Sequence, residues 1–159
     1  MSTLRQTSKS IPIHATPVET IATAVLAVDT SGEGLVEITD DVAGFLARSE
    51  ARDGIVFLHL KHTSASLVIQ ENADPDVQRD LVTALRRLAP EDAGWVHRAE
   101  GPDDMPAHVK AMLNGVSLHV PVAGGVMALG TWQGIYVVEH RRLRHRREVV
   151  LQFLGHCAG

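Results

Sequence analysis

Four histidines in this chain stand where expected helices and strands end, or in the loops between them. Histidine is the commonest metal ligand and the usual proton carrier near neutral pH, and sites are often assembled at such positions. We therefore expect convergence on a divalent metal ion, Zn or Mg, or on an acid–base site, by His62, His97, His108 and His140. The alternative is that each makes a separate structural hydrogen bond, because no pair has the local spacing of HExxH or CxxC.

Carboxylates beside these histidines have competing roles. Glu71 follows a buried strand and could orient an imidazole or hold a cation, as carboxylates around metal sites often do. Asp74 could do the same, although capping a helix is the simpler role for it. Asp103 and Asp104 stand shortly before His108. They could ligate Mg²⁺ through oxygen or merely cap the helix that follows.

Hydroxyl and basic side chains in the same segments suit an anionic group such as a phosphate. These are Thr63, Ser64, Ser66, Lys110 and Arg141. A solvated lysine is the alternative for Lys110. Trp132 and Gln133 stand between two glycines, where the backbone can be approached closely or where the glycines relieve crowding around a core tryptophan. His59 and His119 are interpreted as structural, and no role is assigned to His14, His145 and His156.

The helix signal is clearest after Asp74, whose side chain can cap a helix with Pro75 in its first position. The apolar residues that follow recur at spacings of four, four and three, and should form a core-facing stripe made of Val77, Leu81, Leu85 and Leu88. A shorter helix is expected over about 104–114, ended by Gly115.

A third helix is expected to begin at Thr39, with the threonine hydroxyl as its cap and two aspartates in its first turn. Its apolar face is made of Val42, Phe45 and Leu46.

Strand patterns occupy most of the remaining sequence. Residues 55–62 alternate so that Val56, Leu58 and Leu60 share one face, which His62 ends. Residues 18–38 contain two apolar runs around a glycine-containing turn and are interpreted as a hairpin. Beyond residue 116, the strands SLHVPV, VMALGTWQGIYVVEH and EVVLQFL are joined by short turns, which favours antiparallel pairing. The prediction is an α+β fold, a single domain of mainly antiparallel β-sheets forming a sandwich-like core with a few helices.

Composition narrows the class of protein. The chain has 159 residues, 45% of them apolar, and a net charge of −4. It therefore suits one domain and offers no broad basic face for nucleic acid. No run approaches the roughly 20 apolar residues of a membrane helix, the N-terminus lacks the apolar core of a signal peptide, and a lone Cys157 has no partner. We expect a cytoplasmic protein without membrane or nucleic-acid partners, with an N-terminal extension over 1–15 and a domain over 16–159.

Three sequence blocks, in matching order and spacing, resemble the YjbQ-type family, also called UPF0047. The first is KHTSASL at 61–67 followed by ENADPDV at 71–77. The second is GPDDMPAHVK at 101–110, and the third is LGTWQGI at 129–135, ending in EHR at 139–141. The similarity extends from about residue 18 to the C-terminus. The first fifteen or so residues and the last four have no counterpart in the family pattern, and the turn between Arg141 and Arg147 is unusually basic.

That resemblance implies a secondary thiamine-phosphate synthase-like enzyme, which joins hydroxymethylpyrimidine diphosphate to thiazole phosphate and releases pyrophosphate. It also implies a homotrimer with its cleft near a subunit interface. The catalytic residues would be His62, Glu71 and His108, and the strand that contains Trp132 and Gln133 would line the substrate cleft. Two alternatives stay open: a metal-dependent hydrolase or transferase acting on another small phosphorylated metabolite, and a non-catalytic trimeric protein that binds a metabolite.

Overall fold

Strand β3 (Ala51–Leu60) is the middle strand of the larger sheet, and its apolar residues alternate as the sequence predicts. Val56, Leu58 and Leu60 are buried, whereas Ile55 and Phe57 on the opposite face are exposed. A strand with this alternation needs an apolar layer on one side only. That layer is supplied by a second sheet and one helix.

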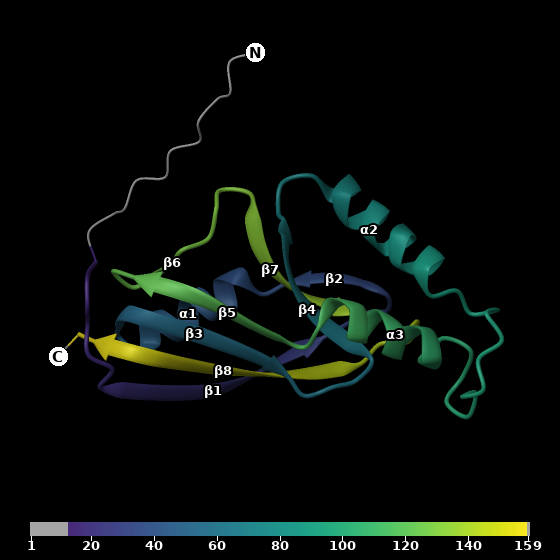
Figure 1. Ribbon diagram of the computed structural model, residues 1–159, viewed down its shortest axis with the longest axis horizontal. Helices are drawn as coiled ribbons and strands as arrows, with labels where there is room; N and C mark the ends of the chain where they lie inside the picture. Colours follow the sequence, from purple (N-terminus) through teal and green to yellow (C-terminus); the bar gives the residue numbers. More distant parts are fainter. Residues whose placement is uncertain (1–12, 159) are drawn as a thin grey trace, which may run out of the picture.

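The computed structural model describes residues 13–158, which form two antiparallel sheets and three helices (Figure 1). The five-stranded sheet has the order β1 (Thr20–Asp29), β8 (Arg146–Cys157), β3, β5 (Ser117–Ala123) and β6 (Val126–Met127). The three-stranded sheet has the order β2 (Gly34–Glu37), β7 (Gln133–Glu139) and β4 (Ala65–Glu71). One buried cluster joins both sheets with helix α1 (Thr39–Arg48). The α+β class and the sandwich-like core are therefore confirmed. The expected extension over 1–15 lies almost entirely outside the described residues.

The expected hairpin over residues 18–38 is wrong. Both strands exist, but β1 pairs with β8 and β2 pairs with β7, so the turn between them moves the chain from one sheet to the other. Gly32 in this turn has φ of +127°, a conformation that glycine adopts easily. Turn residues indicate that the chain changes direction, but they do not determine which strands will pair.

Helix α1 begins where the sequence predicts and buries Val42, Phe45 and Leu46. The predicted hydroxyl cap is wrong, because Thr39 is already helical and Ile38 takes the cap position without a side-chain hydrogen bond. Thr39 Oγ1 instead accepts a hydrogen bond from the Ile135 backbone N–H at 2.9 Å. The hydroxyl thus links the helix to β7.

Helix α2 (Pro75–Leu88) confirms the predicted cap, since Asp74 Oδ1 accepts a hydrogen bond from the Asp76 N–H at 2.8 Å. The prediction that its apolar stripe faces the core is wrong. None of its residues is buried, and Leu88 is 67% exposed. Figure 1 shows the reason: α2 lies on the outside of the molecule, against β2 and α3 (Asp104–Asn114), away from the core that the two sheets share.

Helix α3 has the predicted extent and ends at Gly115, which has φ of +90°. The last predicted strand segments also form, although the long run from Val126 is divided into β6 and β7 by the loop over 128–132. Within the described part of the chain, no helix has the length and apolar content needed to span a membrane.

Candidate metal centre

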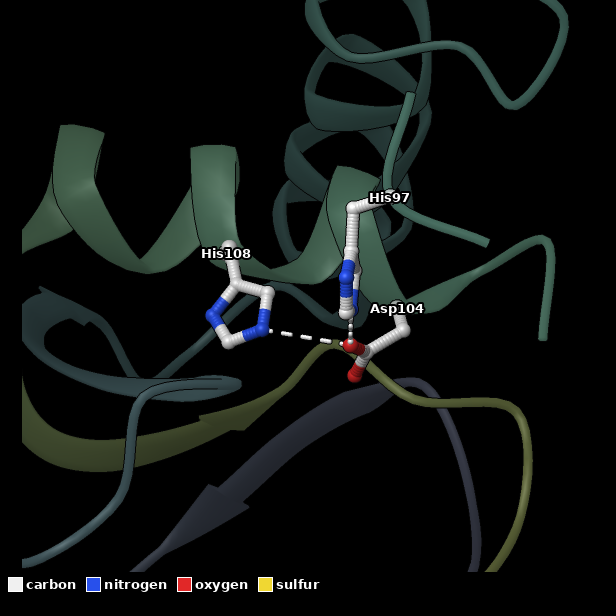
Figure 2. A group of neighbouring side chains, drawn as sticks. All are labelled: His97, Asp104 and His108. Atoms are coloured by element: carbon white, nitrogen blue, oxygen red, sulfur yellow. Dashed lines mark hydrogen bonds and ion pairs between the residues drawn. The ribbon is translucent and has the colours of Figure 1, made fainter. Parts of the chain in front are cut away.

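Helix α3 and the loop before it bring a carboxylate and two imidazoles together. Asp104 and His108 are four residues apart on the helix and therefore lie on the same face. His97 comes from the preceding loop and lies against the Asp104 carboxylate (Figure 2). His97 Nε2 is 2.8 Å and His108 Nε2 is 3.2 Å from the same oxygen, Oδ2 of Asp104. One nitrogen or oxygen from each residue lies within 4.8 Å of the other two.

The imidazole of His108 is oriented by a second hydrogen bond. Its Nδ1 lies 3.0 Å from the carbonyl oxygen of Thr63. Because a carbonyl can only accept, Nδ1 carries the proton. Nε2 of a neutral His108 then directs a lone pair at the Asp104 carboxylate, which requires either a second proton on the ring or a cation between the two groups. Metal-ligating histidines usually have their other ring nitrogen held in this way.

Arg141 fixes the two carboxylates at the start of α3. It forms an ion pair with Asp104 Oδ1, and its Nε lies 3.1 Å from Asp103 Oδ2. Burial disfavours ionisation of Asp103, but hydrogen bonds from the Arg142 backbone N–H and from Arg141 outweigh it and lower the pKa of that carboxyl. Asp103 does not cap α3 through its side chain. With Oδ1 of Asp104 held by Arg141, Oδ2 remains directed at the imidazoles.

His140 is buried and lies outside this cluster. Its Nε2 is 2.9 Å from Ser66 Oγ, which also accepts a hydrogen bond from Asn114 Nδ2 at 3.0 Å. A hydroxyl has one proton and two lone pairs, so Ser66 Oγ can accept from Asn114 and still either donate to Nε2 or accept from it. Burial and the nearby positive charge of Lys110 lower the pKa of His140 to about 4. The imidazole is accordingly neutral at pH 7.

His62 is also engaged elsewhere. Its Nε2 accepts a hydrogen bond from the Glu148 backbone N–H at 2.9 Å. Burial, together with the positive charge of Arg147, lowers the pKa of His62. Within one described chain, the structure therefore unites two of the four predicted histidines, His97 and His108. His62 and His140 make separate hydrogen bonds.

A second buried carboxylate, which sequence reasoning did not single out, lies close by. Glu139 accepts hydrogen bonds from Arg147 at 2.6 and 2.7 Å, from the Arg141 backbone N–H at 2.9 Å and from Thr30 Oγ1 at 2.8 Å. Burial raises the pKa of this carboxyl, but these hydrogen bonds outweigh it and lower the pKa below its ordinary value. Arg147 Nη2 also donates to Ser64 Oγ at 3.1 Å. Ser64, which was expected to bind substrate, therefore supports the ion pair between Arg147 and Glu139.

Three of the predicted site residues lie at the opposite end of β7 from His140: Glu71, Trp132 and Gln133. Gln133 begins this strand, and Glu71 pairs with it. A strand rises about 3.3 Å per residue, so this end is roughly 20 Å from His140. Trp132 is 65% exposed, and Gln133 Oε1 accepts a hydrogen bond from the Gly130 N–H at 2.8 Å. In a single chain, these side chains stand apart from the His97–Asp104–His108 cluster.

A cavity of about 670 Å³ opens on the other flank of α3. Pro106 and Lys110 line it, whereas Asp104 and His108 do not, because residues at these positions face different sides of a helix with 3.6 residues per turn. Lys110 is only 4% exposed, and its Nζ donates to Glu33 Oε1 at 2.6 Å. The solvated-lysine alternative is therefore wrong.

The sequence contained one usable signal for the cluster. Asp104 and His108 have the spacing that brings two side chains together on a helix. The position of Asp104 at the start of the helix fits a helix cap equally well. No local signal could identify His97 as its neighbour, because a loop conformation brings the two together.

Comparison with known proteins agrees with the fold. Residues 24–156 match the family model described as UPF0047 protein YjbQ-like. A UPF0047 protein from Synechocystis sp. is 42% identical over 132 residues, which cover 82% of this chain and 90% of the relative. The crystal structure of an uncharacterized YjbQ/UPF0047 family protein from Clostridium acetobutylicum has a TM-score of 0.77 at 34% identity, with 82% of this chain and 98% of that chain covered. The crystal structure of a hypothetical protein from Aeropyrum pernix K1 has a TM-score of 0.79 at 29% identity. The match covers 85% of this chain and 99% of that chain.

Proposed function

This chain belongs to the YjbQ-like UPF0047 family, and we propose that it is a metal-dependent enzyme acting on a small phosphorylated metabolite. One observation carries the proposal: two imidazole nitrogens and one carboxylate oxygen converge within 4.8 Å of one another. Asp104 is buried, while His97 and His108 are partly exposed, so the centre can be approached from solvent. Three protein ligands with an accessible side are typical of catalytic zinc sites, which keep a fourth position open.

The donor set fits a divalent ion. Zinc accepts imidazole nitrogen and carboxylate oxygen, whereas magnesium prefers oxygen ligands, so the residues present favour zinc. The Thr63 carbonyl and Arg141 hold His108 and Asp104 from outside, and such support is a usual feature of metal sites. His97, Asp104 and His108 would hold the ion.

When bound, the ion would polarise a phosphoryl oxygen and stabilise the negative charge that develops on a departing group. The resemblance makes thiamine-phosphate formation, with release of pyrophosphate, the reaction to test first. His62 and Glu71, which were predicted to act in catalysis, have no contact with the cluster in the described residues of one chain. Their proposed participation therefore depends on a neighbouring subunit.

We propose a homotrimer as the assembly that supplies such a neighbour. The outer face of the five-stranded sheet supports it, because it exposes a set of apolar side chains that includes Ile21, Val25, Ile55 and Phe57. Apolar side chains gathered on one exposed sheet face are typical of an interface. Light scattering should give three times the chain mass, and a monomer at micromolar concentration would overturn the assembly. The lone Cys157 fits the reducing cytoplasm that we propose as the location of this protein.

The decisive experiment compares His108→Ala with His145→Ala. His145 lies in the turn before β8, where its Nδ1 is 2.9 Å from the Leu143 carbonyl oxygen, and serves as a histidine control outside the cluster. Bound metal should be measured by elemental analysis, and thiamine-phosphate formation by chromatography. The unmodified protein and His145→Ala should both retain metal and turnover, whereas His108→Ala should lose both without loss of circular dichroism.

Equal metal content and equal turnover in all three proteins would reject the metal centre. If metal is present but hydroxymethylpyrimidine diphosphate is not consumed, hydrolysis of other phosphate esters should be assayed with the same variants. Loss of that hydrolysis in His108→Ala would assign a hydrolase. Metal binding without any turnover would favour a metabolite-binding protein.

A further inference from the structure

The cavity on the other flank of α3 is lined by residues from four separate segments. These are the turn after β1, the end of α2 with the loop that follows it, α3 with the residue before it, and the segment after β7. Its volume of about 670 Å³ is sufficient for a small metabolite. The charged groups that line it are three cations and three carboxylates: Arg86, Lys110, Arg142, Glu33, Glu91 and Asp103. It does not share its lining with the His97–Asp104–His108 cluster.

Two cations in this cavity share one carboxylate. Lys110 Nζ is 2.6 Å from Glu33 Oε1, and Arg86 Nε is 2.7 Å from Glu33 Oε2. Lys110 is nearly inaccessible, so its charge must be neutralised where it stands. An ammonium has three N–H donors and a guanidinium has five, so neither is saturated by a single carboxylate. The arrangement can bind an anion with more acceptor oxygens than Glu33 provides.

Further hydrogen-bond donors face the same space. His140 lines the cavity with Nε2 against Ser66 Oγ, and in the tautomer with the ring proton on Nδ1 that second nitrogen can donate to a ligand. Among residues 13–158, the structure gives this Nδ1 no hydrogen-bond acceptor. Arg142 lines the cavity from the same segment and is paired with Glu91. Lysine, arginine and neutral imidazole together form a donor set suited to a phosphate group.

The Glu33 side chain is held so that its carboxylate can be displaced from the two cations. It lies between Gly32 and Gly34 in the turn that joins β1 to β2. In the described chain, its carboxylate makes hydrogen bonds and ion pairs only with Lys110 and Arg86. A stronger anion at these two cations would therefore release Glu33 without breaking another contact of its side chain.

We infer that this cavity binds the phosphate group of a small metabolite, and that the phosphate displaces the Glu33 carboxylate from Lys110 and Arg86. The inference deepens the proposed function, on which the choice of a phosphorylated ligand rests. Glu33 acts as an internal competitor that keeps the buried lysine neutralised until the ligand arrives. Binding a ligand phosphate here would place the remainder of the molecule in the same cavity.

The first test measures binding of inorganic phosphate by isothermal titration calorimetry, with the purified full chain in phosphate-free buffer. Glu33→Gln removes the competing charge but keeps the shape of the side chain. It should bind phosphate on the order of tenfold more tightly than the unmodified protein, as removal of a charge-assisted hydrogen bond predicts. Glu148→Gln is the matched control, because Glu148 is also paired with a lysine, Lys61 at 2.7 Å, but outside the cavity. Its phosphate affinity should be unchanged.

The second test removes the lysine as well. Glu33→Gln with Lys110→Met replaces both partners of the buried pair, a change that folded proteins often tolerate better than loss of one partner. Phosphate affinity should fall at least tenfold below that of Glu33→Gln, while the metal content stays that of the unmodified protein.

Equal phosphate affinity in the unmodified protein and Glu33→Gln would overturn the inference, as would undiminished affinity in the double variant. Neither result bears on the proposed metal centre, which is tested separately by elemental analysis of the same samples. Absence of metal from the unmodified protein would instead reject the proposed function, even with the predicted phosphate affinities.

Discussion

Asp104 and Glu139 are two buried carboxylates connected through Arg141, which contacts Asp104 with its side chain and Glu139 with its backbone N–H. Their exposed fractions are 1% and 0%. Both oxygens of Glu139 are saturated by Arg147, Thr30 and the backbone, donors that remain in place near neutral pH. One oxygen of Asp104 is instead approached by two partly exposed imidazoles. Equal burial therefore accompanies different roles: the saturated carboxylate is structural, and the one facing exchangeable donors can bind a ligand.

Replacing each carboxylate by its amide tests this difference most strongly. Glu139→Gln leaves Arg147 buried without a counter-charge, and loss of one partner from a buried ion pair costs about 3–5 kcal/mol. Asp104→Asn should cost only about 1–2 kcal/mol, because Arg141 keeps Asp103 and the imidazoles reach solvent. Urea denaturation followed by circular dichroism gives both values. Equal losses would mean that both carboxylates are structural.

The segment that joins Glu139 to Arg141 should be sensitive to pH through His140. Its pKa is lowered from 6.5 to about 4, so between these values the unfolded chain binds more protons than the folded protein. The stability contributed by the neutral imidazole is complete above about pH 6.5 and falls by about 3 kcal/mol as the pH decreases through 4. His140→Gln should remove this dependence. Urea denaturation between pH 7 and 4 measures it, and parallel curves for the two proteins would contradict the prediction.

Zinc should stabilise the protein through Asp104 and leave Glu139 unaffected. A ligand present at about one hundred times its dissociation constant raises the free energy of unfolding by about 2.7 kcal/mol. We expect this increase in the unmodified protein and in Glu139→Gln, and no increase in Asp104→Asn. Urea denaturation with and without zinc provides the measurement. An undiminished increase in Asp104→Asn would remove this carboxylate from the metal centre.

The smallest effect is expected at a third carboxylate, that of Asp74, which is exposed and accepts one backbone hydrogen bond at 2.8 Å. Asp74→Ala should cost about 1 kcal/mol, the usual value of a helix cap. Asp74→Asn keeps an acceptor in the same place and should cost nearly nothing. Denaturation of both variants separates the two expectations. If Asp74→Ala lost as much stability as Glu139→Gln, burial would not explain the difference between the carboxylates.

Local geometry could be predicted because it depends on neighbouring residues. The start of α2 follows from Asp74 and Pro75, and the end of α3 follows from Gly115, because their effects are exerted within one turn. The buried face of β3 follows from the alternation of its side chains. The i, i+4 placement of Asp104 and His108 on one helix face is likewise a local relation that the sequence predicts. In each case, the backbone determines the relation between the residues.

Tertiary structure determined the remaining features, because they join segments that the sequence does not relate. Lys110 meets Glu33 across 77 positions, and Ser66 meets His140 across 74. Both helices have an apolar face. Its residues are buried in α1 and none is buried in α2, because only α1 packs between the two sheets. Hydrophobic periodicity identifies a face and leaves its partner open, since burial is favourable against any apolar surface. The sequence by itself therefore determined the elements and the residue types available for chemistry, and packing determined which of those residues meet.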